Sequence, residues 1–150
     1  MTYHGGMGAL AVLVASACIS ASVSYGTPPD PGAPHIPWIH AGPVSGYLFY
    51  YSESGPWKTQ PDRVFITPRG GIPGVGGYAT KILWHVRGAR GALILSGLRL
   101  DAPGRFRQRF PAISGSYFPS ILSVPTEGCW RVAVRSGRRM GRFAFLALAP

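Results

Sequence analysis

Residues 128–135 read Gly-Cys-Trp-Arg-Val-Ala-Val-Arg, and this order of apolar and charged side chains is typical of a β-strand with one buried face. In an extended chain successive side chains point to opposite faces, so Trp130, Val132 and Val134 share one face and the arginines share the other. The pattern therefore predicts a strand that points Trp130 into a core. The same alternation places Cys129 away from the core, where it is badly positioned to link two sheets.

A second stretch, Lys81–Arg87, alternates in the same way. Ile82, Trp84 and Val86 fall on one face, while His85 falls on the other. Trp84 is therefore predicted to be a second core residue.

The composition of the chain also disfavours helices. The 150 residues include 21 glycines and 15 prolines, and hydrophobic residues make up 46% against 13% charged residues. After the first 25 residues, no run without glycine or proline exceeds ten residues, which is shorter than an average helix of about 11 to 12 residues. The chain is therefore neither a helical protein nor a disordered polyelectrolyte.

Seven short β-prone runs, separated by turn residues, follow Gly46, and their number and spacing predict an all-β, immunoglobulin-like antiparallel β-sandwich of about seven strands. The seven runs are Tyr47–Tyr51, Arg63–Thr67, Thr80–Arg87, Ala92–Leu100, Ser120–Val124, Cys129–Arg135 and Arg142–Leu148.

Residues 1–17 are predicted to be a signal peptide. The apolar stretch Ala9–Ile19 is too short to span a bilayer but has the length of a signal-peptide core. Small residues lead into Cys18, as in the lipobox of bacterial lipoproteins, where this cysteine becomes the lipidated first residue. Ala15-Ser16-Ala17 also suits ordinary cleavage, and the absence of Lys and Arg from residues 1–8 leaves a buried segment of the fold as a third reading.

Whether Cys18 and Cys129 can pair depends on how this leader is processed. Lipidation of Cys18, or cleavage beyond it, would leave Cys129 without a partner. Only cleavage directly before an unmodified Cys18 would allow the two cysteines to pair.

The rest of the chain divides at about residue 46. Residues 18–46 are rich in proline and glycine and lack a hydrophobic period, which predicts an extended tether. Residues 47–150 are predicted to form the immunoglobulin-like domain.

Three stretches of the chain resemble a loosely defined group of small exported bacterial proteins. They are Lys81–Trp84, Leu98–Pro103 and Phe118–Val132, and the last of them contains Pro-Thr-Glu-Gly-Cys-Trp-Arg-Val. The resemblance implies an immunoglobulin-like sandwich and export, and it implies no activity.

Motifs for catalysis and metal binding are weak. The chain has five acidic residues, four of them in turn-like settings, and it has no Gly-x-Ser-x-Gly motif. We therefore expect no catalytic residues, no cofactor and no metal site, although His35 and His40 have a spacing that two ligands of one ion could use. The alternative function is a small exported hydrolase or thiol enzyme that uses Cys129 and His85.

The formal net charge of +10 indicates an anionic partner. In an extended segment, Arg105, Arg107 and Arg109 would share one face, and Arg138 and Arg139 would lie in the turn between the last two predicted strands. Edge-strand protection and a solvated hairpin are the favoured structural explanation of these arginines. The functional alternative is that these five arginines bind anions.

Together these features predict a non-catalytic exported binding or structural module of the bacterial cell envelope. Its expected partners are an anionic envelope lipid or polymer, or another envelope protein, and a lipid on Cys18 would anchor it to the membrane or else it would be secreted. Nucleic acid is not an expected partner of an exported chain.

Overall fold

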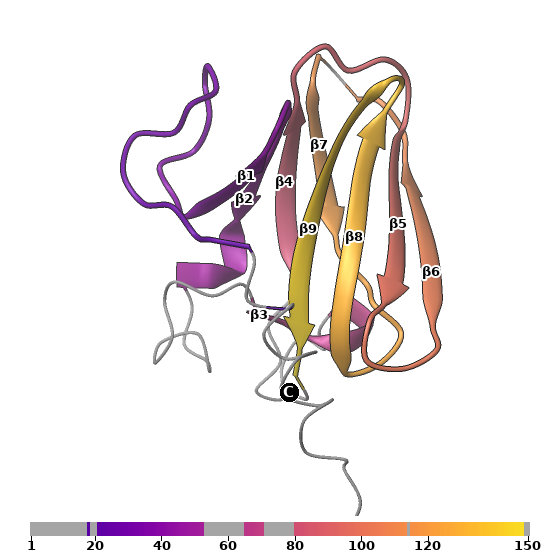
Figure 1. The fold of residues 1–150 in the computed structure, drawn as a ribbon. Helices are drawn as coiled ribbons and strands as arrows, with labels where there is room; N and C mark the ends of the chain where they lie inside the picture. The colour runs from indigo at the N-terminus through magenta and orange to yellow at the C-terminus, as the bar shows by residue number, and fades with distance from the viewer. Residues whose placement is uncertain (1–17, 19–20, 53–64, 71–79, 114, 149–150) are drawn as a thin grey trace, which may run out of the picture.

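A computed structural model describes residues 18, 21–52, 65–70, 80–113 and 115–148, and it contains two β-sheets packed face to face (Figure 1). One sheet has the strand order β1-β2-β4-β7 and is antiparallel throughout. Its strands are β1 (Trp38–Ala41), β2 (Val44–Leu48), β4 (Lys81–Val86) and β7 (Tyr117–Ile121).

The second sheet has the strand order β3-β9-β8-β5-β6. Its strands are β3 (Phe65–Ile66), β5 (Leu93–Arg99), β6 (Arg105–Phe110), β8 (Gly128–Ser136) and β9 (Arg139–Ala147). All pairs are antiparallel except the short β3, which runs parallel to β9. The prediction of an all-β sandwich is thus confirmed.

The core lies between the sheets and contains both predicted tryptophans. Trp84 and Trp130 are fully buried, as are Val132 and Val134, so the predicted face of each strand is confirmed. Glycine makes room for Trp84, because a Cβ at Gly46 would lie 2.6 Å from the indole ring.

Two strands were missing from the seven predicted runs. β6 has the alternation expected for Arg105–Phe110, with its arginines exposed and the residues between them half-buried. β1 lies in the segment predicted to be a tether. The predicted strand Tyr47–Tyr51 is wrong in its second half, because β2 ends at Leu48 and the 3₁₀ helix η1 (Phe49–Ser52) follows.

The prediction of a tether over residues 18–46 is corrected by the sheet itself. β1 and β2 both begin before residue 47 and pair with each other, and β2 also pairs with β4. Ser24 forms an isolated bridge with Trp38, so the chain is attached to the sandwich before β1 begins. The high proline content concealed these strands because proline is unfavourable within a sheet, whereas β1 and β2 themselves contain no proline.

Candidate functional site

The outer face of the five-stranded sheet carries six exposed arginines. Cross-strand register places three rows side by side on this face, one through Ile94, one through Ser96 and one through Leu98 of the central strand β5. Each row has an arginine from β6 at one end, and β8 or β9 supplies a second arginine. We call this surface the arginine face; its arginines are Arg105, Arg107, Arg109, Arg131, Arg135 and Arg142.

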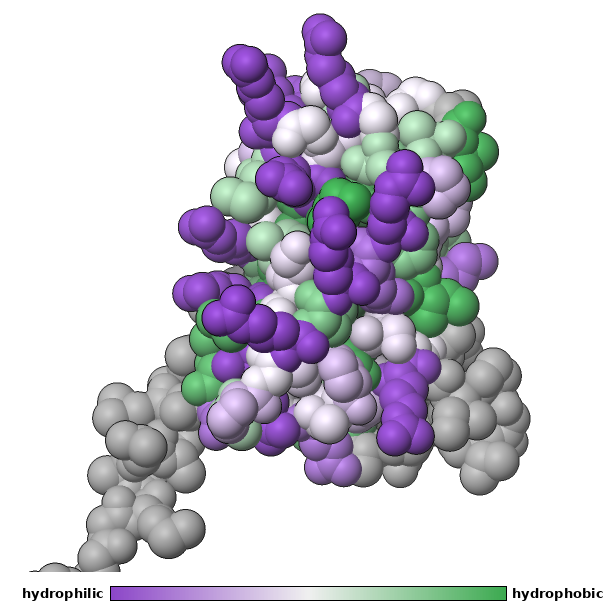
Figure 2. Space-filling model, turned by 90° about the vertical axis from the view of Figure 1, so that its right-hand side faces the viewer, coloured by the Kyte–Doolittle hydropathy of each residue, from purple (hydrophilic) through white to green (hydrophobic). Residues whose placement is uncertain are grey.

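The arginine face is compact. Residues two apart on one strand are separated by about 6.8 Å and neighbouring strands by about 4.8 Å, so the six Cα atoms lie within an area of about 14 by 14 Å. In Figure 2, hydrophilic side chains project from the side of the sandwich nearest β6, with apolar surface visible between them. The half-buried Ile94 and Leu98 lie between arginines in their rows, and the 40% exposed Met140 ends the row that contains Arg109 and Arg135.

No acid among the described residues forms an ion pair with an arginine of the arginine face. The ion pairs of the described residues join Asp30 to His85 and Asp101 to Arg99, and neither pair includes an arginine of this face. The third described acid, Glu127, forms no ion pair within that part of the chain. The face is therefore a concentrated positive field that an anionic surface would neutralise.

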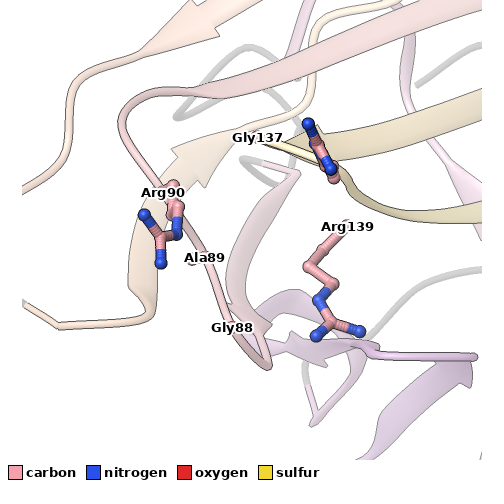
Figure 3. Close-up of a pocket in the computed structure, with 6 residues that line it drawn as sticks. Gly88, Ala89, Arg90, Gly137 and Arg139 are labelled. Carbon is pink, nitrogen blue, oxygen red and sulfur yellow. The ribbon is translucent and has the colours of Figure 1, made fainter.

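A second basic region lies at one end of the sandwich, where two turns meet. The first turn joins β4 to β5 and contains Arg90; the second joins β8 to β9 and contains Arg138, with Arg139 directly after it. A hollow of about 880 Å³ lies between the turns and is lined by these three arginines and by small residues (Figure 3). We call it the tip hollow; its small residues are Gly88, Ala89 and Gly137.

The five predicted anion-binding residues thus separate into two groups. Arg105, Arg107 and Arg109 belong to the arginine face, and Arg138 and Arg139 line the tip hollow. The structure adds Arg131, Arg135 and Arg142 to the first group and Arg90 to the second. The sequence contained the alternation that turns Arg131 and Arg135 outward, but strand order was needed to place them beside β6.

Cys18 and Cys129 form a disulfide with a Cα–Cα distance of 5.6 Å. Cys129 is paired in register with Leu146 on the outer face of the sheet, and both cysteines are buried. The prediction that Cys129 points away from the core is confirmed, and the bond does not link the two sheets. It attaches Cys18 to the outer face of the five-stranded sheet, next to the row of the arginine face that contains Arg131.

This disulfide bears directly on the predicted lipidation of Cys18. A lipobox cysteine carries its lipid on the same sulfur atom that here bonds to Cys129, so the disulfide and the lipid exclude each other. The pairing corresponds to the alternative in which Cys18 remains unmodified.

The thiol enzyme alternative required Cys129 and His85 to meet, and the structure separates them. His85 lies on β4 in the four-stranded sheet and Cys129 on β8 in the other, and each faces outward from the core. Cys129 also lacks a free thiol. The proposed pair therefore does not form.

His85 instead takes part in a buried polar cluster with Asp30. Nδ1 of His85 lies 2.9 Å from one carboxylate oxygen of Asp30, and the Tyr47 hydroxyl donates a 2.6 Å hydrogen bond to the other. Burial, together with the adjacent Asp30 carboxylate, raises the pKa of Tyr47 well above its ordinary value. The Tyr117 ring packs against His85 in a tilted arrangement, and its hydroxyl donates a hydrogen bond to the Pro31 carbonyl.

This cluster explains why the proline-rich segment does not hang free. A buried carboxylate is costly unless it is paired, and Asp30 reaches a paired state only when its segment packs on the sheet. The sequence offered no signal for this role, because Asp30 sits between prolines like an ordinary turn residue.

The described residues contain no group of three or more His, Cys, Asp or Glu side chains placed to hold a metal ion, and no helix among them has the length and hydropathy to cross a membrane. His35 and His40, whose spacing two ligands of one ion could use, belong to no such group in the part of the chain that the structure describes.

No family model, curated protein or solved structure matches this chain.

Proposed function

We propose that this chain is an exported, non-catalytic module that binds an anionic lipid surface of the cell envelope through its arginine face. The observation that carries the proposal is the convergence of six arginines, unpaired with any described acid, on one outer sheet face. All six lie close enough together to meet one surface at the same time.

Two features support export. The first is the signal-peptide pattern of residues 1–17, in which cleavage after Ala17 would leave Cys18 as the first residue of the mature chain. The second is the disulfide of Cys18, because such bonds persist in oxidising compartments outside the cytoplasm. An unmodified Cys18 accounts for both features.

The side chains between the arginines favour a lipid surface over a soluble polymer. Ile94, Leu98 and Met140 place apolar surface among the guanidinium groups. Arginine has an apolar stem and a charged head, so such a face suits the boundary between headgroups and acyl chains. A soluble polyanion would leave this apolar surface in water.

The expected strength follows from the charge count. Each arginine close to an anionic bilayer contributes about 1 kcal/mol, within a Debye length of about 8 to 10 Å. Loss of three such residues should cost about 3 kcal/mol, which corresponds to a decrease in affinity of roughly 100-fold.

The test is vesicle co-sedimentation at physiological salt. Wild type should bind vesicles containing phosphatidylglycerol and phosphatidylcholine, bind pure phosphatidylcholine poorly, and lose binding as salt rises. Changing Arg105, Arg107 and Arg109 together to Gln should weaken binding without lowering the unfolding midpoint, because all three are exposed.

The matched control changes Arg90, Arg138 and Arg139 to Gln, which removes the same three charges from the tip hollow. If both triple variants bind these vesicles equally weakly, net charge alone explains the attraction and the arginine face has no special role. Equal binding of wild type to neutral vesicles would contradict the proposal. Binding to soluble polyphosphate but not to vesicles would identify a polymer as the partner instead.

A further inference from the structure

The tip hollow differs from the arginine face in shape, because its arginines surround a concave space. Arg90 in the first turn and Arg139, directly after the second turn, lie across the hollow from each other, with Gly88 and Gly137 on its lining (Figure 3). None of the three lining arginines forms an ion pair with a carboxylate in the described residues. The hollow is thus a concave, cationic space without a counter-charge from that part of the chain.

The backbone of the hollow is fixed by a buried serine. Ser136 is completely buried at the end of β8, accepts a hydrogen bond from the backbone N–H of Arg90 at 3.1 Å, and lies 3.1 Å from its carbonyl oxygen. The Ser136 side chain, directly before the second turn, therefore bonds to the backbone of Arg90 in the first turn. The contact links the backbone of Arg90 to Ser136, which is paired with Arg139 in the β8–β9 hairpin.

Glycines let the two turns approach closely. Gly137 has a φ of 61° and begins a two-residue hairpin turn, a position that favours glycine, and a Cβ there would lie 3.1 Å from the Cβ of Arg90. Gly88 has a φ of 76°, and a Cβ there would lie 3.0 Å from Nε of Arg139. These glycines allow arginines from two separate turns to line one hollow.

We propose that the tip hollow is a binding site for a phosphomonoester group, carried by a sugar phosphate or by a lipid headgroup. Guanidinium groups donate paired hydrogen bonds that match phosphate oxygens, and three of them line this space. A phosphomonoester is close to doubly charged at neutral pH and exposes three terminal oxygens, so it can engage more than one guanidinium at once. A phosphodiester has fewer free oxygens and one charge.

The size of the hollow favours a ligand larger than inorganic phosphate. Its volume of about 880 Å³ lies within the usual range of small-molecule sites, about 300 to 1,000 Å³. A sugar or glycerol group attached to the phosphate would occupy the space that the phosphate leaves. This site is separate from the arginine face, so the inference goes beyond the proposed function and does not depend on it.

Calorimetric titration of the full mature chain tests the site with glucose 6-phosphate as the probe and glucose and methyl phosphate as references. We expect glucose 6-phosphate to bind, glucose not to bind, and methyl phosphate to bind more weakly. The variant Arg90→Gln/Arg138→Gln/Arg139→Gln should lose at least 10-fold in affinity. The variant Arg105→Gln/Arg107→Gln/Arg109→Gln, with the same net charge, should bind as wild type does.

Vesicles distinguish a lipid source from a soluble one. If a lipid headgroup is the ligand, vesicles with phosphatidic acid should bind more tightly than vesicles of equal surface charge with phosphatidylglycerol, and glucose 6-phosphate should compete for that excess. If a soluble sugar phosphate is the ligand, the two vesicles should bind equally while the calorimetric signal remains.

Two results would overturn the site. One is the absence of any glucose 6-phosphate binding by folded wild type, and the other is an equal loss of affinity in both triple variants. Neither result affects the proposal for the arginine face. Its own test measures binding to phosphatidylglycerol vesicles, where the arginine-face variant should bind more weakly than the tip-hollow variant. The single variant Ser136→Ala adds a check on the scaffold: it should weaken glucose 6-phosphate binding and leave binding to phosphatidylglycerol vesicles unchanged.

Discussion

Breaking the disulfide between Cys18 and Cys129 is expected to destabilise the sandwich substantially. The bond closes a loop with a sequence separation of 111 residues, and that loop contains the whole four-stranded sheet and the strands β3, β5 and β6 of the other sheet. Removing the bond gives the unfolded chain more conformations and also releases the segment attached to β8. The folded state should therefore lose stability even though every core contact between the sheets remains.

The loop length sets the size of the effect. The chain-entropy relation assigns about 4.7 kcal/mol to a loop of about 100 residues, and loss of a native disulfide in small exported domains costs about 2 to 5 kcal/mol. With a urea dependence of about 2 kcal/mol per molar, the unfolding midpoint should fall by about 1 to 2.5 M. This is a large share of the stability of an ordinary domain, which is about 5 to 15 kcal/mol.

Urea unfolding of four proteins measures this effect: wild type, Cys18→Ala, Cys129→Ala and the double variant. Both single variants break the same bond, so the double variant should be about as stable as either single one. Dithiothreitol should lower the midpoint of wild type to theirs and should not change the double variant. A reductant-insensitive wild type, or single variants whose losses add up in the double variant, would refute a bond between these two cysteines.

Three further outcomes test the packing and the charges. Trp84→Ala should cost about 3 to 5 kcal/mol of unfolding free energy, because the side chain is fully buried in the core, and an unchanged urea midpoint would show that it is not. Gly97→Ala should cost about 1 to 3 kcal/mol, since its Cβ would overlap the Phe106 ring, and thermal unfolding at wild-type temperature would contradict that contact. Burial raises the pKa of Asp101, but hydrogen bonds from Arg99 and from the backbone N–H of Cys129 have the larger combined effect, so the pKa of Asp101 is lowered in the folded protein. The ionised carboxylate therefore stabilises the fold above the unfolded pKa of about 3.9, and this stabilisation is lost as pH falls through the lower folded pKa. The stability gap between wild type and Asp101→Asn should accordingly be present at pH 7 and close at acidic pH, whereas a gap independent of pH would contradict the role of the charge.

Local sequence patterns were sufficient for the class of fold. The alternation around Trp84 and Trp130 identified two core faces correctly, because a strand alternates its side chains regardless of its neighbours. The exposed arginines of β6 followed from the same rule. Proline content, by contrast, predicted a tether where β1 and β2 lie, because composition does not report the partner that a segment finds.

The sequence alone determined what each strand turns inward and outward, that the chain is basic, and that export and an anionic partner are reasonable expectations. Only the tertiary structure decided which outward-facing residues become neighbours. It placed Arg131 and Arg135 beside the arginines of β6, brought Arg90 to the turn that follows Ser136, and paired Asp30 with His85. The physical reason is that strand order and segment docking depend on contacts between residues far apart in the chain, whereas strand alternation depends only on the local backbone.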